Sequence, residues 1–225
     1  MNIKEIPDPF ISNKSENVYS PSDDSYLIID YFKENITSTH FDSIEFDSIT
    51  NVLDMGTGTG IIAIFLLLIK KVYPNFKPQI YASDIIEEAI HCAKLNEKLN
   101  NFEEDIIFLQ SDLFKSFPQR LKQKFNIIIF NPPYLPSIKG NKIPFDLSWN
   151  GGVKGIEILE SFLDEVIEFI EGNKKNYIYF ISSSIVHSKQ INKICRERGF
   201  IHKILRKKHV FFEDIILNRL EIYIK

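Results

Sequence analysis

The sequence predicts an α/β protein with a doubly wound, mostly parallel sheet. From residue 51 onward, short β-branched runs alternate with stretches of helical periodicity, which is the pattern of βαβ units. A glycine-rich turn over residues 56–60 joins the first of these runs to an apolar helix. An aspartate also stands at or just after the end of three successive strands. Open α/β sheets bind their ligands at the carboxyl ends of the strands, so a site is expected there.

Length and composition fit one globular domain. The 225 residues carry 44% hydrophobic side chains, so we expect a single domain over residues 1–225 with an irregular segment at 1–17. A net charge of −3 argues against a general nucleic-acid binder. The longest apolar run, Ile61–Ile69, is less than half a membrane span, and no secretory start is visible.

The cysteines and histidines indicate no metal site. Cys92 and Cys195 are far apart without CxxC spacing, and the five histidines form no HxxxH or HxH pair. We therefore expect free thiols, a reducing cytoplasmic location and no protein-bound metal.

The first expected helix starts within Val18–Ser25. Ser22 is placed to cap it, with Asp23 and Asp24 in the first turn. Two interpretations of this segment remain: a capping segment, which the sequence physics favours, and a lid whose Asp24 and Ser25 face a ligand.

The glycine turn lies between a strand, Asn51–Met55, and a helix, Ile61–Lys71. Its glycines are Gly56, Gly58 and Gly60. Glycine lets the backbone approach a ligand closely ahead of a helix N-terminus. A dinucleotide fingerprint would need a glycine where Ile61 stands. Asp54 would repel a pyrophosphate but can receive an ammonium or sulfonium group. The alternative is a purely structural turn.

Two more acids follow the next strands. Gln79–Asp84 ends in Asp84, which is placed to bind ribose hydroxyls. The strand Asp105–Gln110 is followed by Asp112 and Leu113, which would accept from an exocyclic amine and cover a purine face. Each acid alone is more often a solvated turn residue, but three in one βαβαβ unit favour a ligand site.

A strand over Phe125–Phe130 ends in Asn131-Pro132-Pro133-Tyr134. Two consecutive prolines cannot donate to a ladder and hold the preceding residues extended. The chain therefore leaves the sheet presenting a carboxamide, two carbonyls and an aromatic ring. This set can accept two hydrogen bonds from an NH2 group and stack on the plane that carries it. The alternative is an ordinary Asn-Pro turn.

The segment Leu135–Lys154 has no periodicity and carries the only tryptophan, Trp149, so we interpret it as a substrate loop. The other expected elements are helices Ile86–Asn100, Ile156–Ile170 and Val186–Arg198, the strand Asn176–Ser182, and an antiparallel pair, Phe200–Lys207 and Leu217–Ile224.

With these residues assembled, the chain resembles class I S-adenosylmethionine-dependent methyltransferases over nearly its whole length. More narrowly, it resembles the HemK-type glutamine N5-methyltransferases that modify the GGQ glutamine of peptide-chain release factors. The segments that carry the resemblance are VYSPSDDS at 18–25, LDMGTGTG at 53–60, Asp84, SDL at 111–113, NPPY at 131–134 and WNGGVKG at 149–155. The resemblance implies a seven-stranded sheet with an antiparallel last strand.

The resemblance also implies a role for each site residue. Ser25, Asp54 and the Gly56, Gly58 and Gly60 loop would hold the methionine end of S-adenosylmethionine, Asp84 the ribose, and Asp112 with Leu113 the adenine. Asn131, which also borders the cofactor, and the Pro132 carbonyl would accept the two hydrogens of the substrate amide beside Tyr134. Asp54 stands where the short eukaryotic and archaeal type often has glutamate, and Ser25 where threonine is common.

The short type lacks the helical N-terminal domain of bacterial members and works as a heterodimer with a small zinc-binding activator subunit. The resemblance therefore implies such a partner, which we expect to pair with the edge strand Asp105–Gln110. Three alternatives stay open: an adenine or guanine N-methyltransferase acting on nucleic acid, which the acidic balance disfavours, a lysine methyltransferase, and a non-catalytic cofactor-binding scaffold.

Overall fold

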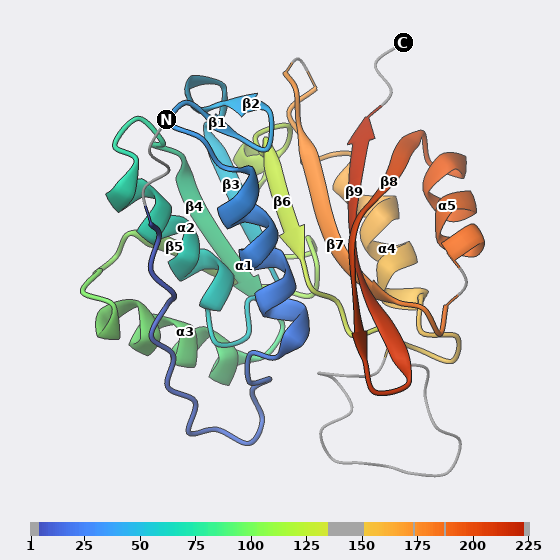
Figure 1. Cartoon of the computed structure of the whole chain (residues 1–225), viewed down its shortest axis with the longest axis horizontal. Helices are drawn as coiled ribbons and strands as arrows, with labels where there is room; N and C mark the ends of the chain where they lie inside the picture. Colours follow the sequence, from blue (N-terminus) through green and yellow to red (C-terminus); the bar gives the residue numbers. More distant parts are fainter. Residues whose placement is uncertain (1–4, 135–150, 173, 187, 223–225) are drawn as a thin grey trace.

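A seven-stranded sheet runs through the computed structural model, which describes residues 5–134, 151–172, 174–186 and 188–222. Its strand order is β5-β4-β3-β6-β7-β9-β8 (Figure 1). All neighbours are parallel except β9, which runs antiparallel to both β7 and β8. The strands are β3 Asn51–Met55, β4 Gln79–Asp84, β5 Ile106–Gln110, β6 Ile127–Phe130, β7 Tyr177–Ser183, β8 Phe200–Val210 and β9 Glu213–Ile222. The expected fold class, with its antiparallel last strand, is confirmed.

Helices cover both faces of the sheet. The helices α1 Asp23–Asn35, α2 Ile61–Val72 and α3 Glu87–Leu99 lie on one side, and α4 Glu157–Val166 and α5 Ser188–Glu197 on the other. Every residue of α2 from Ile61 to Ile69 is buried, because the helix contacts α1, α3 and strands β3 and β4. A helix that is apolar all round belongs in such a position, which explains the longest apolar run of the sequence. None of the helices in the described ranges is long and apolar enough to cross a membrane.

The site lies where the strand order reverses. β3 and β6 are neighbours, with Met55 opposite Phe130 at their carboxyl ends. From β3 the chain builds outward to β4 and β5, and from β6 it builds the other way to β7. The connections diverge at this point and leave a crevice, as at the ligand-binding switch point of doubly wound folds.

Several element bounds differ from expectation. β6 begins at Ile127 rather than Phe125, and α4 ends at Val166 rather than Ile170. Ser22 precedes α1 as expected, but its side chain makes no capping hydrogen bond. The expected loop between Lys207 and Leu217 is wrong, because β8 and β9 stay paired up to Val210 and Glu213.

The structure also has short elements that the sequence did not predict. They are a two-stranded hairpin, β1 His40–Phe41 and β2 Ile44–Glu45, and the 3-10 helices η1 Phe46–Ser48 and η2 Gln119–Leu121. The N-terminal segment has no helix or strand over residues 5–17, as expected. The predicted substrate loop, including Trp149, lies outside the described residues up to position 150, as do residues 223 and 224.

Candidate active site

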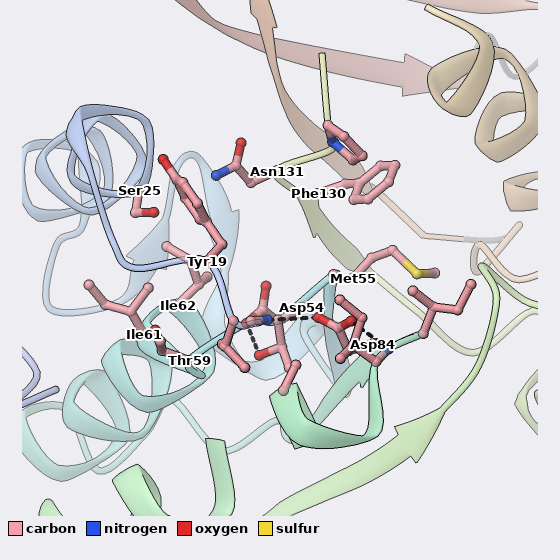
Figure 2. Close-up of a pocket in the computed structure, with 18 of the residues that line it drawn as sticks. Tyr19, Ser25, Asp54, Met55, Thr59, Ile61, Ile62, Asp84, Phe130 and Asn131 are labelled. Atoms are coloured by element: carbon pink, nitrogen blue, oxygen red, sulfur yellow. Dashed lines mark hydrogen bonds between the residues drawn. The ribbon is translucent and has the colours of Figure 1, made fainter. Parts of the chain in front are cut away.

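A cavity opens at the carboxyl ends of β3, β4, β5 and β6 and is closed on one side by residues 18–25 (Figure 2). Its polar wall contains three aspartates, Asp54, Asp84 and Asp112, and no lysine, arginine or histidine among the described lining residues. Its apolar wall is formed by side chains from several parts of the chain, Ile61, Ile62, Ile85, Ile86, Leu113, Phe130 and Ile158 among them. An acidic cavity of this kind disfavours polyphosphates and favours a ligand that carries positive charge.

Asp54 lies at the floor of the cavity and is almost fully buried. Its Oδ2 accepts hydrogen bonds from Thr57 Oγ1 at 2.6 Å and from the backbone N–H of Ala63 at 3.1 Å. Burial raises the pKa of this carboxyl to about 7, and the nearby Asp84 adds to the rise. A cation in the cavity would favour the ionised form.

The glycine loop combines a binding and a packing role. Gly56 has φ 65°, and a Cβ there would lie 3.3 Å from the Phe130 ring. Gly60 has φ 85° at the start of α2, and its Cβ would lie 2.9 Å from Cβ of Ala93 in α3. The loop therefore needs glycine both for its left-handed backbone and for the close approach of α3.

Asp84 turns its carboxylate toward the glycine loop. Gly58 N–H donates to Oδ2 at 2.9 Å, and Ile86 N–H donates to Oδ1 at 3.0 Å. Burial raises the pKa of this group. Each oxygen keeps a second lone pair, so the carboxylate can still accept two vicinal hydroxyls.

Asp112 and Leu113 also line the cavity after β5, as the sequence predicted. The Asp112 side chain is 47% exposed and pairs with Lys115, which the sequence analysis did not foresee. Leu113 has φ 47°, a left-handed conformation that directs its side chain away from the regular course of the chain.

Asn131 provides the one buried polar side-chain atom without a hydrogen-bond partner among the described residues that line the cavity. Its side-chain oxygen is buried and has no hydrogen-bond partner among the described residues. Figure 2 shows its amide on the same side of the cavity as Tyr19 and Ser25, away from Asp54 and Asp84. A buried carbonyl without a donor costs free energy, which a ligand N–H would recover.

The two prolines have different positions. Pro133 lines the cavity, whereas Pro132 is not among its lining residues and borders a smaller cavity toward β7. A Cβ on Gly151 would lie 2.7 Å from the Pro133 carbonyl oxygen. The glycine motif that follows Asn150 therefore packs directly against the proline turn.

Asp24 connects the two ends of the site. It is buried, and its Oδ2 accepts from the Tyr19 hydroxyl at 2.8 Å and the Tyr134 hydroxyl at 3.3 Å. Its Oδ1 accepts from Ser25 N–H at 2.6 Å and from Ser25 Oγ at 3.1 Å. Burial and the Asp24 charge raise the pKa of both tyrosines.

The capping interpretation that the sequence favoured for this segment is therefore incomplete, because Ser25 lines the cavity. The sequence analysis also missed Tyr19 and the pairing of Asp24 with Tyr134. The only signal in the sequence was that these residues stand in the two motif segments, Tyr19 and Asp24 in 18–25 and Tyr134 in 131–134. In the described part of the chain, no group of three histidine, cysteine or acidic side chains is placed to hold a metal ion.

Comparison with known proteins gives consistent matches. A family model described as a methyltransferase domain matches residues 46–216. A Methanocaldococcus jannaschii protein, named as a candidate protein N5-glutamine methyltransferase, is 33% identical over 203 residues and 89% of each chain. The Schizosaccharomyces pombe eRF1 methyltransferase catalytic subunit mtq2 is 26% identical, over 86% of this chain and 84% of its own.

Among solved structures, the E. cuniculi Mtq2–Trm112 complex, described as responsible for methylation of the eRF1 translation termination factor, matches with a TM-score of 0.64. The match covers 92% of this chain and 99% of that one at 21% identity, which is a likeness of fold.

The fold and the acidic cavity define a class I S-adenosylmethionine-dependent methyltransferase. The cavity fits that cofactor, because it offers carboxylates and no described cation to a positively charged sulfonium, and apolar side chains to a purine. Within this class, the chain belongs to the family of protein N5-glutamine methyltransferases.

Proposed function

We propose that this enzyme methylates the side-chain amide nitrogen of the GGQ glutamine in a peptide-chain release factor, in the cytoplasm. The observation that carries the proposal is the buried, unpartnered side-chain oxygen of Asn131 at the cavity wall. A glutamine amide supplies the N–H that this oxygen lacks. The relatives support the choice of macromolecule, since the S. pombe protein is named for eRF1.

The cofactor would occupy the acidic side of the cavity. We assign Asp84 to the ribose hydroxyls, Asp112 and Leu113 to the adenine, and Asp54, Ser25 and the Gly56, Gly58 and Gly60 loop to the methionine end. When bound, S-adenosylmethionine supplies an electrophilic methyl group on its sulfonium. The Asp54 and Asp84 carboxylates compensate the positive charge at that end.

The substrate amide needs positioning more than a base. Its nitrogen is a poor nucleophile, because the lone pair is delocalised into the carbonyl. We propose that Asn131, at the cavity wall, and the carbonyl of Pro132, which borders the adjoining smaller cavity together with Tyr134, hold both N–H groups and stabilise the positive charge that develops on nitrogen. Positioning of this kind lowers a barrier by roughly 7–11 kcal/mol. No general base is then obligatory before attack.

The direct test is methyl transfer from labelled S-adenosylmethionine. We expect label in the intact release factor, none in its glutamine-to-alanine variant, and none in rRNA or DNA. Transfer to nucleic acid instead would favour the adenine or guanine alternative, and transfer to lysine the other enzyme alternative. Cofactor binding without any transfer would favour a scaffold.

We further propose a small activator subunit at the edge strand β5. β5 is an edge of the sheet as expected, and Ile107 on it is 37% exposed. The segment 70–78, the alternative cover for this edge, is used elsewhere, since Tyr73 and Phe76 pack against Phe46. An open apolar edge invites strand addition by a partner.

The E. cuniculi relative was solved with Trm112 as its partner. The zinc-binding character of such a subunit is implied only by the family resemblance, and metal analysis of the purified complex would test it.

Replacing Ile107 with lysine should break this complex. We expect Ile107→Lys to lose co-purification with the activator, while Ile201→Lys, at the opposite edge of the sheet, retains it. An isolated chain that is soluble and fully active, or a complex that leaves Ile106–Gln110 uncovered, would contradict the proposal.

A further inference from the structure

The turn between β8 and β9 consists of two phenylalanines that contact almost nothing. Val210 pairs with Glu213, so Phe211 and Phe212 alone form the turn. Phe211 is 89% exposed and Phe212 is 100% exposed. They are the two most exposed of the large apolar side chains in the described part of the protein, and Val153 follows at 74%.

The sequence of this turn opposes its conformation. Two-residue hairpin turns in which the first central residue has positive φ favour glycine at that position. Phe211 adopts φ 53°, which is an outlier for a bulky residue. A strained and solvent-exposed pair of aromatic rings contributes nothing to the fold, so the explanation must come from outside it.

The turn stands beside the substrate side of the cavity. Lys208, in the hairpin stem, pairs with Asp23 at 2.8 Å, one residue before Asp24. The Glu213 carboxylate bonds Ser183 at the end of β7, and its charge helps to raise the pKa of Tyr134. Figure 1 shows the turn projecting past the carboxyl end of β6, on the side where the chain of residues 131–134 leaves the sheet.

We propose that the Phe211–Phe212 turn docks the protein substrate, inserting both rings into an apolar depression on the release-factor domain that presents the glutamine. This inference rests on the proposed function and adds the surface that recognises the folded substrate protein. Buried aromatic side chains are the usual anchors of protein interfaces. A single glutamine in the clamp cannot distinguish one protein from another, whereas a second contact outside the cavity can.

The charges around the turn favour a protein over a nucleic acid. Single-stranded nucleic acid also stacks on aromatic rings, but it needs a basic groove alongside. Here Lys208 is paired with Asp23, Arg206 with Glu34, and His209 with Asp214. Of the four consecutive basic residues 206–209, this leaves Lys207 as the one for which the described part of the chain provides no ion pair, and a single lysine does not make a basic groove.

The test uses a variant that removes the rings and improves the turn. Phe211→Gly combined with Phe212→Asn places the glycine at the turn position that has positive φ, so the variant should fold at least as well as the wild type. We expect unchanged affinity for S-adenosylmethionine and unchanged kinetics on a short glutamine peptide. For the intact release factor we expect KM to rise by at least about tenfold with kcat nearly unchanged. The control is Ile201→Ser, an exposed apolar residue at the other end of β8, which should leave all of these values unchanged.

The possible results separate the docking role from the proposed function. A KM for the release factor within about twofold of wild type would overturn the docking role, while leaving the proposed function intact. An equal loss on peptide and protein would place the turn in the chemistry rather than in docking and would also overturn it. A wild-type enzyme without activity on any release factor would overturn the proposed function itself. Binding of wild type to lipid vesicles or RNA that depends on Phe211 and Phe212 would assign the turn to that ligand instead.

Discussion

The two sides of the active-site cavity are built in opposite ways. On the cofactor side, Asp54 and Asp84 are each held by two donors, which come from the segments that follow β3 and β4 and from the first turn of α2. On the substrate side, Asn131 has an oxygen without a partner, and Tyr134 bonds Asp24 across 110 residues of sequence. The cofactor side is satisfied by local contacts before any ligand arrives. On the substrate side, the hydrogen bond that Asn131 lacks forms only when a substrate binds. We therefore expect selectivity for a macromolecule on this side.

The largest expected effect on activity comes from a substitution on the substrate side of the cavity. We expect Asn131→Ala to lower the single-turnover rate by at least about 10²–10³-fold, as removal of one preorganised polar group does in other enzymes. Cofactor affinity, measured by calorimetry on the same variant, should change little, because Asn131 lies away from Asp54 and Asp84. A wild-type rate would show that the amide clamp is elsewhere.

A smaller effect, on cofactor affinity, is expected from a substitution on the cofactor side of the cavity. Asp84→Ala should weaken S-adenosylmethionine binding by about 1.5–3 kcal/mol, the range for hydrogen bonds to a charged group. Its matched control is Asp105→Ala, an exposed acid just before β5 at the other end of the strand. Calorimetry that gives equal affinities for both variants would remove Asp84 from the ribose site.

The smallest effect concerns Asp54 and pH. Its folded pKa of about 7 lies above the value of an unfolded aspartate, so its protonated form stabilises the ligand-free fold at low pH. That stability is complete below the unfolded pKa and is lost as pH rises through the folded one. Between about pH 6 and pH 8 the loss amounts to about 1.4 kcal/mol, or a few degrees in Tm.

The variant Asp54→Asn isolates this contribution. Its amide oxygen can still accept from Thr57 and Ala63, but the group no longer ionises. We expect the ligand-free variant to melt above wild type at pH 8 and to match it more closely near pH 6, with weaker cofactor binding. Thermal melts that show the same pH dependence in both proteins would contradict the raised pKa.

The same contrast explains what the sequence could predict. The strands β3 and β4, the glycine loop and the acids Asp54 and Asp84 follow from short-range patterns. Asp54, Asp84, Gly56 and Gly58 line the cavity as expected, whereas Gly60 is not among the lining residues and faces Ala93 of α3. The Asp24–Tyr134 contact joins distant segments, so no local pattern contains it. Asp112 was placed correctly, but its pairing with Lys115 was not foreseen.

The predicted length of the C-terminal hairpin was wrong for a related reason. The sequence Lys208–Ile216 is polar and charged at its start and was predicted as a loop, but both flanking strands are held in register by pairing. β9 lies between β7 and β8 and bonds to both, so the ladder extends to Val210 and Glu213 whatever the local preference. Phe211 and Phe212 were therefore hidden inside a predicted loop.

Asp24 has a further consequence, for the order in which the two ligands bind. One carboxylate oxygen accepts from Tyr19, which lines the cofactor cavity, and from Tyr134, which belongs to the clamp. A cofactor that fixes Tyr19 also fixes the acceptor that Tyr134 needs. Tyr134 and its neighbours are then already ordered when the glutamine binds, so the substrate loses less conformational entropy on binding. Cofactor bound first should therefore raise the affinity for the substrate. By linkage, the substrate tightens the cofactor complex by the same factor.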